Sequence, residues 1–233
     1  MPDSLPQRLG STHLEDLAIV ALTASANQDR LPVHPDLDNQ RRARLRSRLK
    51  QVGRHDWPSS LAEDPLLRRG YTLRQCCRLV AALMLIDAHL APSDAIALAK
   101  ANEFTLLRVI APRLTAEEHN PSQPDPADLL VVIPLGELVS LIADQQWRGA
   151  RPQALRLIQR SDLSLLWSDR AELAFAGQRL IIDLGSAAAA MWRWMAERNL
   201  MTDDARIELL SEIEGSRRER GYAGTTAPIR RRR

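Results

Sequence analysis

The chain has very little cysteine. Among its 233 residues only Cys76 and Cys77 occur, side by side within an apolar segment. Adjacent cysteines cannot join distant parts of a chain, and the pair lacks the Cys-x-x-Cys spacing of metal ligands. This pattern excludes a disulfide framework and indicates a reducing compartment.

Long apolar runs are also missing. The longest, residues 79–86, is far shorter than the roughly 20 residues that cross a bilayer. The first ten residues contain no apolar signal region. We therefore expect a cytoplasmic protein with no membrane partner. Aromatic residues make up only 4% of the chain, and five of them are Trp, so the core must be mainly aliphatic.

Catalytic motifs are absent as well. There is no P-loop, GxGxxG or nucleophile elbow, and the five histidines lie without HExxH spacing or a cysteine pair that would complete a zinc site. One segment is a candidate anion or metal site, because a strand leads through Asp183 and Gly185 into a helix starting at Ser186. A strand end followed by an N-cap explains the same residues. We predict a non-enzyme without catalytic residues, cofactor or metal, and keep an enzyme centred on Asp183 as an alternative.

What the chain has in excess is clustered arginine. Residues 39–79 hold eleven Arg or Lys against three acids, a balance of +8, whereas the whole chain carries only +3. A basic helical segment is typical of proteins that bind a phosphate backbone, because each neutralised phosphate releases counterions. Residues 216–233 add seven Arg against one Glu, a basic tail that can supply nonspecific affinity. Nucleic acid is therefore the expected partner.

The first basic element is a predicted helix over residues 39–53. Leu45, Leu49 and Val52 form one narrow apolar stripe along it, with basic residues on both flanks. Seven basic residues occur in 41–54 without an acid, so the helix forgoes the i,i+4 ion pairs usual on a surface helix. A phosphate partner would remove this repulsion; the alternative is a solvated face that keeps the protein soluble. The predicted DNA contacts here are Arg41, Arg42, Arg44, Arg46, Arg48, Lys50 and Arg54.

Capping signals and periodicity predict that the first half of the chain is all helical. Thr12-x-x-Glu15 and Thr72-x-x-Gln75 are capping boxes, and apolar residues at helical spacing follow each of them. Besides 39–53, the predicted helices cover residues 12–26, 72–88, 92–101 and 103–110.

The second half adds strands. Residues 115–127 contain three prolines and predict a linker between domains. The elements predicted beyond it are a strand at 129–133, a helix at 135–147, two short strands within 154–167, a hairpin of 171–176 with 179–184, and helices starting at Ser186 and Thr202. Gly215 is expected to end the last helix.

The predicted fold class is mainly α, with an all-helical, helix-turn-helix-like N-terminal domain followed by a small α+β C-terminal domain. Trp192 and Trp194 lie two positions apart on one helix and point to different faces, so one of them is expected at a dimer or partner interface. The predicted parts are a disordered N-terminus (1–10), a helical DNA-binding domain (11–114), a Pro-rich linker (115–126), an α+β dimerisation or partner-binding domain (127–215) and a disordered basic tail (216–233).

Residues 68–73, Arg-Arg-Gly-Tyr-Thr-Leu, precede a helix, a short turn and a second helix. This segment resembles the winged helix-turn-helix module of MerR-type regulators, in which a basic wing leads into an aromatic residue and a helix. The resemblance covers about residues 40–101 if the basic helix supplies part of the helix-turn-helix. It implies phosphate or groove contact by Arg68, Arg69 and Arg74, with Tyr71 as a wing residue. A plain hydrophobic staple is the alternative for Tyr71.

Together these features predict a sequence-specific transcriptional regulator that binds double-stranded DNA as a homodimer, through a basic helix and a wing. One or two arginines would read guanine edges in the major groove, and paired reading heads would match two half-sites. RNA stays open as the nucleic acid. The alternative function is a non-enzymatic adaptor that docks on an acidic partner, such as the transcription machinery or a phage-derived assembly.

Overall fold

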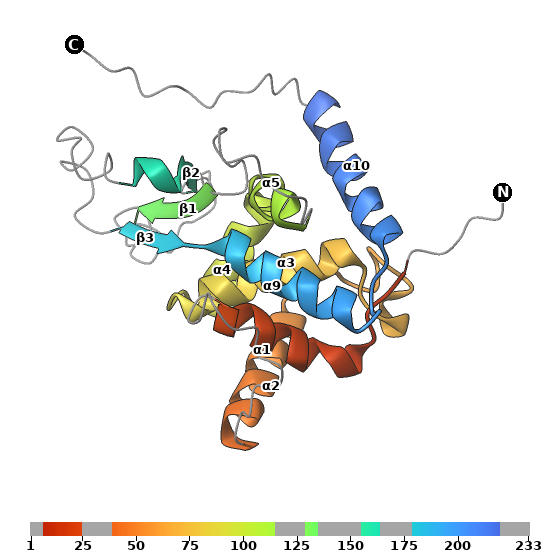
Figure 1. Cartoon of the computed structure of the whole chain (residues 1–233). Helices are drawn as coiled ribbons and strands as arrows, with labels where there is room; N and C mark the ends of the chain where they lie inside the picture. Colours follow the sequence, from red (N-terminus) through yellow and green to blue (C-terminus); the bar gives the residue numbers. More distant parts are fainter. Residues whose placement is uncertain (1–6, 25–38, 115–128, 135–154, 164–178, 220–233) are drawn as a thin grey trace, which may run out of the picture.

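The computed structural model describes residues 7–24, 39–114, 129–134, 155–163 and 179–219. This part of the chain is mainly helical with a small antiparallel sheet (Figure 1), which confirms the predicted mainly α class. The helices are α1 (Leu14–Ala24), α2 (Asn39–Arg54), α3 (Leu73–Asp87), α4 (Pro92–Ala101), α5 (Glu103–Leu114), α9 (Leu184–Glu197) and α10 (Asp203–Glu219). The 3-10 turns are η1 (Ser11–His13), η2 (Leu67–Arg69) and η3 (Arg160–Asp162), and the strands are β1 (Leu129–Pro134), β2 (Arg156–Gln159) and β3 (Arg179–Ile182).

Two of the predicted helix starts show how local signals act. The capping box of α3 forms as predicted, because the Thr72 hydroxyl accepts from the Gln75 N–H while the Gln75 side chain accepts from the Thr72 N–H at 2.9 Å. At α1 the predicted start is wrong by two residues. Thr12 lies inside η1, and the α-helix begins at Leu14.

Three helices continue beyond their predicted ends. α2 includes Gly53, α10 includes Gly215 and reaches Glu219, and α5 runs to Leu114 with Pro112 inside it. Glycine permits a left-handed helix end without requiring one. Gly53 and Gly215 have open space around their α-carbons, so nothing at either position forces the chain to turn.

α9 joins the two halves of the chain into one core. It packs against α1 and α5, and α3 lies against the same helices. Leu17, Val80, Ile110 and Met191 are all fully buried within one continuous cluster. The described residues of the two predicted domains, 11–114 and 127–215, therefore share one core. An apolar stripe indicates that a helix is buried but not which partner covers it. The predicted linker, residues 115–126, lies outside the described residues.

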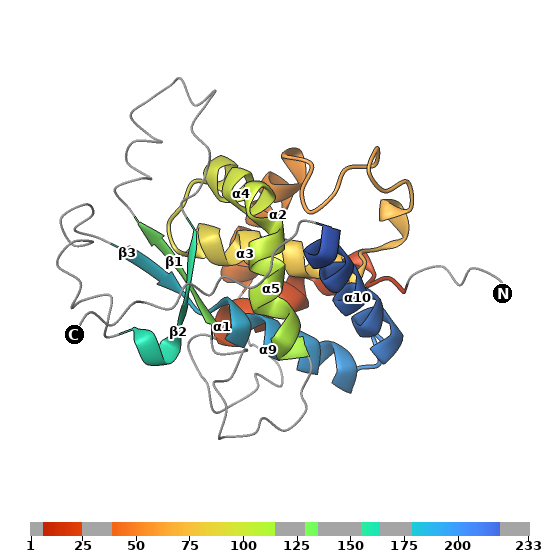
Figure 2. The same cartoon turned by 90° about the horizontal axis from the view of Figure 1, so that it is seen from above.

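The sheet lies at one end of the helical body, and α10 lies at the other, as Figure 2 shows from above. β1 is the middle strand in the order β2-β1-β3, and both pairings are antiparallel. Leu130 faces Ile158 of β2, and Val132 faces Ile181 of β3. The predicted strand at 129–133 is confirmed. The predicted helix at 135–147 and the hairpin partner at 171–176 lie outside the described residues.

Residues 7–10 are bonded to other parts of the described chain, which corrects the prediction that these four residues are disordered. Leu9 is 1% exposed and forms an antiparallel bridge with Tyr71. The Gln7 side chain accepts from the backbone N–H of Thr202. Short termini become ordered when an apolar residue and backbone hydrogen bonds tie them down. At the other end, residues 216–219 belong to α10 rather than to the tail, and 220–233 lie outside the described residues.

Candidate nucleic-acid interface

α2 is attached to the body along one narrow side and points away from the other helices (Figure 1). The apolar stripe predicted from the sequence makes this attachment: Leu45 and Val52 are buried, and Leu49 packs partly buried against the core. Most of the remaining described side chains of the helix are exposed.

Three arginines beside this stripe form ion pairs with acids of neighbouring helices. The pairs are Arg42 with Asp16 (3.4 Å), Arg46 with Glu15 (2.6 Å) and Arg48 with Asp87 (3.6 Å). Two of the acids lie in the first turn of α1, and the third ends α3. The hydrogen bond to Glu15 raises the pKa of Arg46. We call Arg42, Arg46 and Arg48 the inner arginines; each already has a carboxylate partner, and their predicted contact with DNA stays a prediction.

The opposite side of α2 carries three cations that we call the outer cations: Arg44, Lys50 and Arg54. All three are exposed, with the exposed residues Ser47 and Gln51 between them. Among the residues that the structure describes, no acid pairs with any outer cation. The side chain of Arg41 lies outside the description. The predicted basic helix therefore has a paired inner flank and an unpaired outer face.

The predicted wing is a compact turn. Arg68 and Arg69 lie in η2 and are exposed. Tyr71 is half-buried against the core, and burial raises the pKa of its phenol. Its backbone exchanges hydrogen bonds of 2.7 and 2.9 Å with Leu9. Within the described chain, this part of the molecule is thus a 3-10 turn followed by a single bridge, and Tyr71 is placed as a packing residue.

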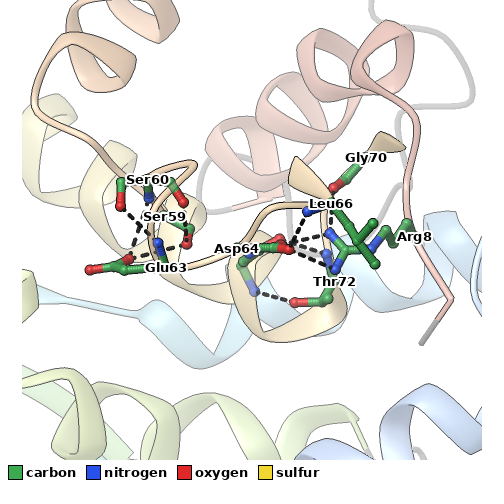
Figure 3. Close-up of polar contacts among 9 residues, drawn as sticks. Arg8, Ser59, Ser60, Glu63, Asp64, Leu66, Gly70 and Thr72 are labelled. Carbon is green, nitrogen blue, oxygen red and sulfur yellow. Dashed lines mark hydrogen bonds and ion pairs between the residues drawn. The ribbon is translucent and has the colours of Figure 1, made fainter. Parts of the chain in front are cut away.

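The loop that carries Arg68 and Arg69 is fixed by a carboxylate. Asp64 accepts two hydrogen bonds from the Arg8 guanidinium, at 2.7 and 3.0 Å, and one from Gln75 Nε2 at 2.7 Å (Figure 3). It also accepts from the backbone N–H of Leu66 at 3.0 Å. The bonds from Arg8 lower the pKa of Asp64, against an opposing effect of burial. No local sequence pattern predicts this network, since Arg8 and Asp64 are 56 positions apart.

A second carboxylate closes the start of the same loop. Glu63 accepts from the Ser60 N–H at 3.3 Å and the Ser59 hydroxyl at 3.1 Å, and its own N–H donates to the Ser60 hydroxyl (Figure 3). The bond from the Ser60 N–H, followed by that from Ser59, lowers the pKa of Glu63. These local bonds shape the loop without help from another element.

Replacing Asp64 by Asn tests how much the Asp64 network contributes to the stability of the fold. We expect a loss of about 1–3 kcal/mol of unfolding free energy at neutral pH, because a charge-assisted pair becomes a neutral one. The folded pKa lies below the unfolded one, so the carboxylate stabilises the fold above about pH 4 and ceases to do so as pH falls through the folded pKa. Urea unfolding at several pH values should show the wild type and Asp64→Asn converging in acid; a gap that does not change with pH would contradict this.

Arg74 lies on α3, outside the basic helix and the η2 turn, and its side chain already forms ion pairs. Its guanidinium pairs with Glu103 of α5 at 2.8 Å and with Glu212 of α10 at 3.0 Å. It links three helices, and its predicted role as a DNA contact stays a prediction. One turn further along α3, Arg78 stacks 4.2 Å above the Trp57 ring, whose Nε1 donates to the Arg78 carbonyl.

The two tryptophans of α9 are buried within their own chain. Trp192 and Trp194 are each 6% exposed. Trp194 meets His13 edge to face and has Arg198 above its ring, while Arg206 lies over Trp192. Little of either ring remains for a second subunit to cover, so the predicted tryptophan interface stays a prediction that this burial does not support.

Asp183 caps α9. Its carboxylate accepts from the Ser186 N–H at 2.9 Å and the Ser186 hydroxyl at 2.7 Å, and it pairs with Arg160. Burial opposes ionisation, yet the bonds from Ser186 and Arg160 lower the pKa of Asp183. The helix starts at Leu184 because this cap precedes it, rather than at Ser186. The residues thus form the strand end with N-cap that the sequence allowed.

No protein-family model, curated protein or solved structure matches this chain. Across the described ranges, no three or more His, Cys, Asp or Glu residues gather as metal ligands. In the same part of the chain, none of the helices combines the length and the apolar character that crossing a membrane requires. Function is therefore inferred from charge and geometry.

Proposed function

We propose that this protein is a DNA-binding regulator that holds duplex phosphates on the outer face of α2. The outer cations carry the proposal: Arg44, Lys50 and Arg54 are exposed and have no acid partner among the described residues, on a helix that points away from the body. Phosphates would supply the missing counter-charge and release bound cations. An α-helix with its side chains is about as wide as the major groove of B-DNA.

α2 is also the only helix between residues 39 and 87 with a surface free enough to meet DNA. Twelve of the fifteen residues of α3 are buried, so α3 supports the site and does not enter a groove. The Arg68–Arg69 turn is proposed as a second phosphate contact. The MerR-like helix-turn-helix order, the homodimer with two half-sites and the cytoplasmic location remain part of the same proposal.

Titration of labelled duplex DNA over a range of salt concentrations tests this function. The logarithm of the binding constant should fall linearly with the logarithm of salt concentration, by about 0.9 for each phosphate contacted. Three outer cations and two turn arginines predict a slope of about 3 to 5. A flat plot, or no binding at about 50 mM salt, would contradict the proposal.

A second candidate function is an adaptor that docks on an acidic protein surface, for example of the transcription machinery. The observation that favours it is that the inner arginines already bind carboxylates of α1 and α3. Replacing Arg44 and Arg48 by Glu should then abolish capture of the protein partner while DNA binding is unchanged. Loss of DNA binding in that variant would favour the first function.

A further inference from the structure

Residues 7–10, which we call the N-terminal strap, hold the Arg68–Arg69 turn from both sides. Upstream of the turn, Arg8 binds Asp64 through two hydrogen bonds. Downstream, the same guanidinium donates to the Gly70 carbonyl at 2.9 Å, and Leu9 pairs with Tyr71. A single short segment therefore closes the loop at each end of its two exposed arginines (Figure 3).

Gly70 shows how closely the strap approaches. Its φ is +132°, and a Cβ at this position would lie 2.5 Å from the Leu9 carbonyl oxygen and 3.0 Å from the carbonyl carbon. Both neighbours are backbone atoms, which cannot move aside as a flexible side chain can. Glycine is required here for its conformation and for the space it leaves.

Apart from the strap, the turn is held by the bonds of Asp64 to Gln75 and Leu66 and by short-range backbone hydrogen bonds, but not by burial of its own side chains. None of the three residues of η2 is buried, and a short turn without buried apolar contacts belongs to the part of a fold that opens most easily. Arg8 is itself only 12% exposed and is bound to Asp64, so it is not available as a phosphate contact.

We propose that Arg8, acting with Asp64, is a positioning residue of the nucleic-acid site, and that the strap keeps Arg68 and Arg69 ordered for phosphate contact. The consequence for binding rests on the proposed function; the fastening of the turn does not. Pre-ordering matters because a turn that is mobile before binding must be ordered during binding, which lowers affinity.

Trypsin tests the fastening without DNA, because it cleaves after arginines only where the chain can open. In the full chain, Arg8→Gln should speed cleavage after Arg68 and Arg69 about tenfold, as identified by the masses of the fragments. Gly70→Ala should do the same while leaving the Arg8 charge in place. Arg193→Gln, which removes an exposed arginine of α9, is the matched control and should leave the cleavage rate unchanged. An unchanged rate in both strap variants would overturn the proposal.

A double-mutant cycle tests the binding role. Arg8→Gln should weaken duplex binding about three- to tenfold in the wild-type background, and have no further effect once Arg68 and Arg69 are Gln, because the two changes act through one contact. Equal losses in both backgrounds would overturn the positioning role, since they would indicate a structural effect unrelated to the turn. No binding by the wild type would overturn the proposed function and the binding role together, while the trypsin result would still decide the fastening.

Discussion

Replacing Met191 by Ala is expected to lower the free energy of unfolding by about 2–5 kcal/mol, the usual cost of removing a large buried side chain. Met191 is fully buried on α9, the helix that packs against both α1 and α5. The cavity would therefore weaken the N-terminal and C-terminal halves of the core at once. Urea unfolding followed by tryptophan fluorescence and by circular dichroism should show one transition, shifted equally by both probes.

Arg193→Gln is the control for this prediction, because it alters the exposed side of the same helix. It should change the unfolding free energy by less than about 0.5 kcal/mol. Two separate transitions, of which Met191→Ala shifts only one, would show that the two halves of the chain have independent cores and would contradict the single cluster.

Reversing all three outer cations, with Arg44, Lys50 and Arg54 each replaced by Glu, is expected to weaken duplex binding at least about 100-fold. The variant replaces three attractions to phosphate with three repulsions. Its fold should be retained, because the three side chains are exposed and unpaired among the described residues. Titration at low salt measures the affinity, and circular dichroism shows whether the helices are intact.

The matching control is Arg193→Glu on α9, which should bind within about threefold of the wild type. Binding of the triple variant within about tenfold of the wild type, with its fold intact, would show that DNA does not contact this face of α2.

Features encoded within a few residues could be predicted from the sequence. The capping box at Thr72 and Gln75, the proline that starts α4 at Pro92 and the apolar run of β1 each act through neighbours in sequence. The predicted apolar stripe of α2 is also confirmed, since the burial of Leu45 and Val52 follows from periodicity alone.

What could not be predicted depends on which distant residues meet. The charge of the inner arginines is visible in the sequence, but their pairing depends on how the fold places the acids of α1 and α3 beside α2. The strap is a similar case. No residue near Leu9 indicates that it pairs with Tyr71. Gly70 is a local signal of a turn or a close backbone contact, but the sequence does not show which segment makes that contact.

Whether the outer face of α2 binds phosphate can be tested directly by comparing two triple variants of this helix that lose the same charge. One replaces the outer cations by Gln and the other replaces the inner arginines by Gln. Salt titration with duplex DNA should show the slope falling by about 3 in the outer variant and by less than about 1 in the inner variant. Equal losses of slope in the two variants, or a larger loss in the inner one, would contradict the assignment of phosphate binding to the outer face.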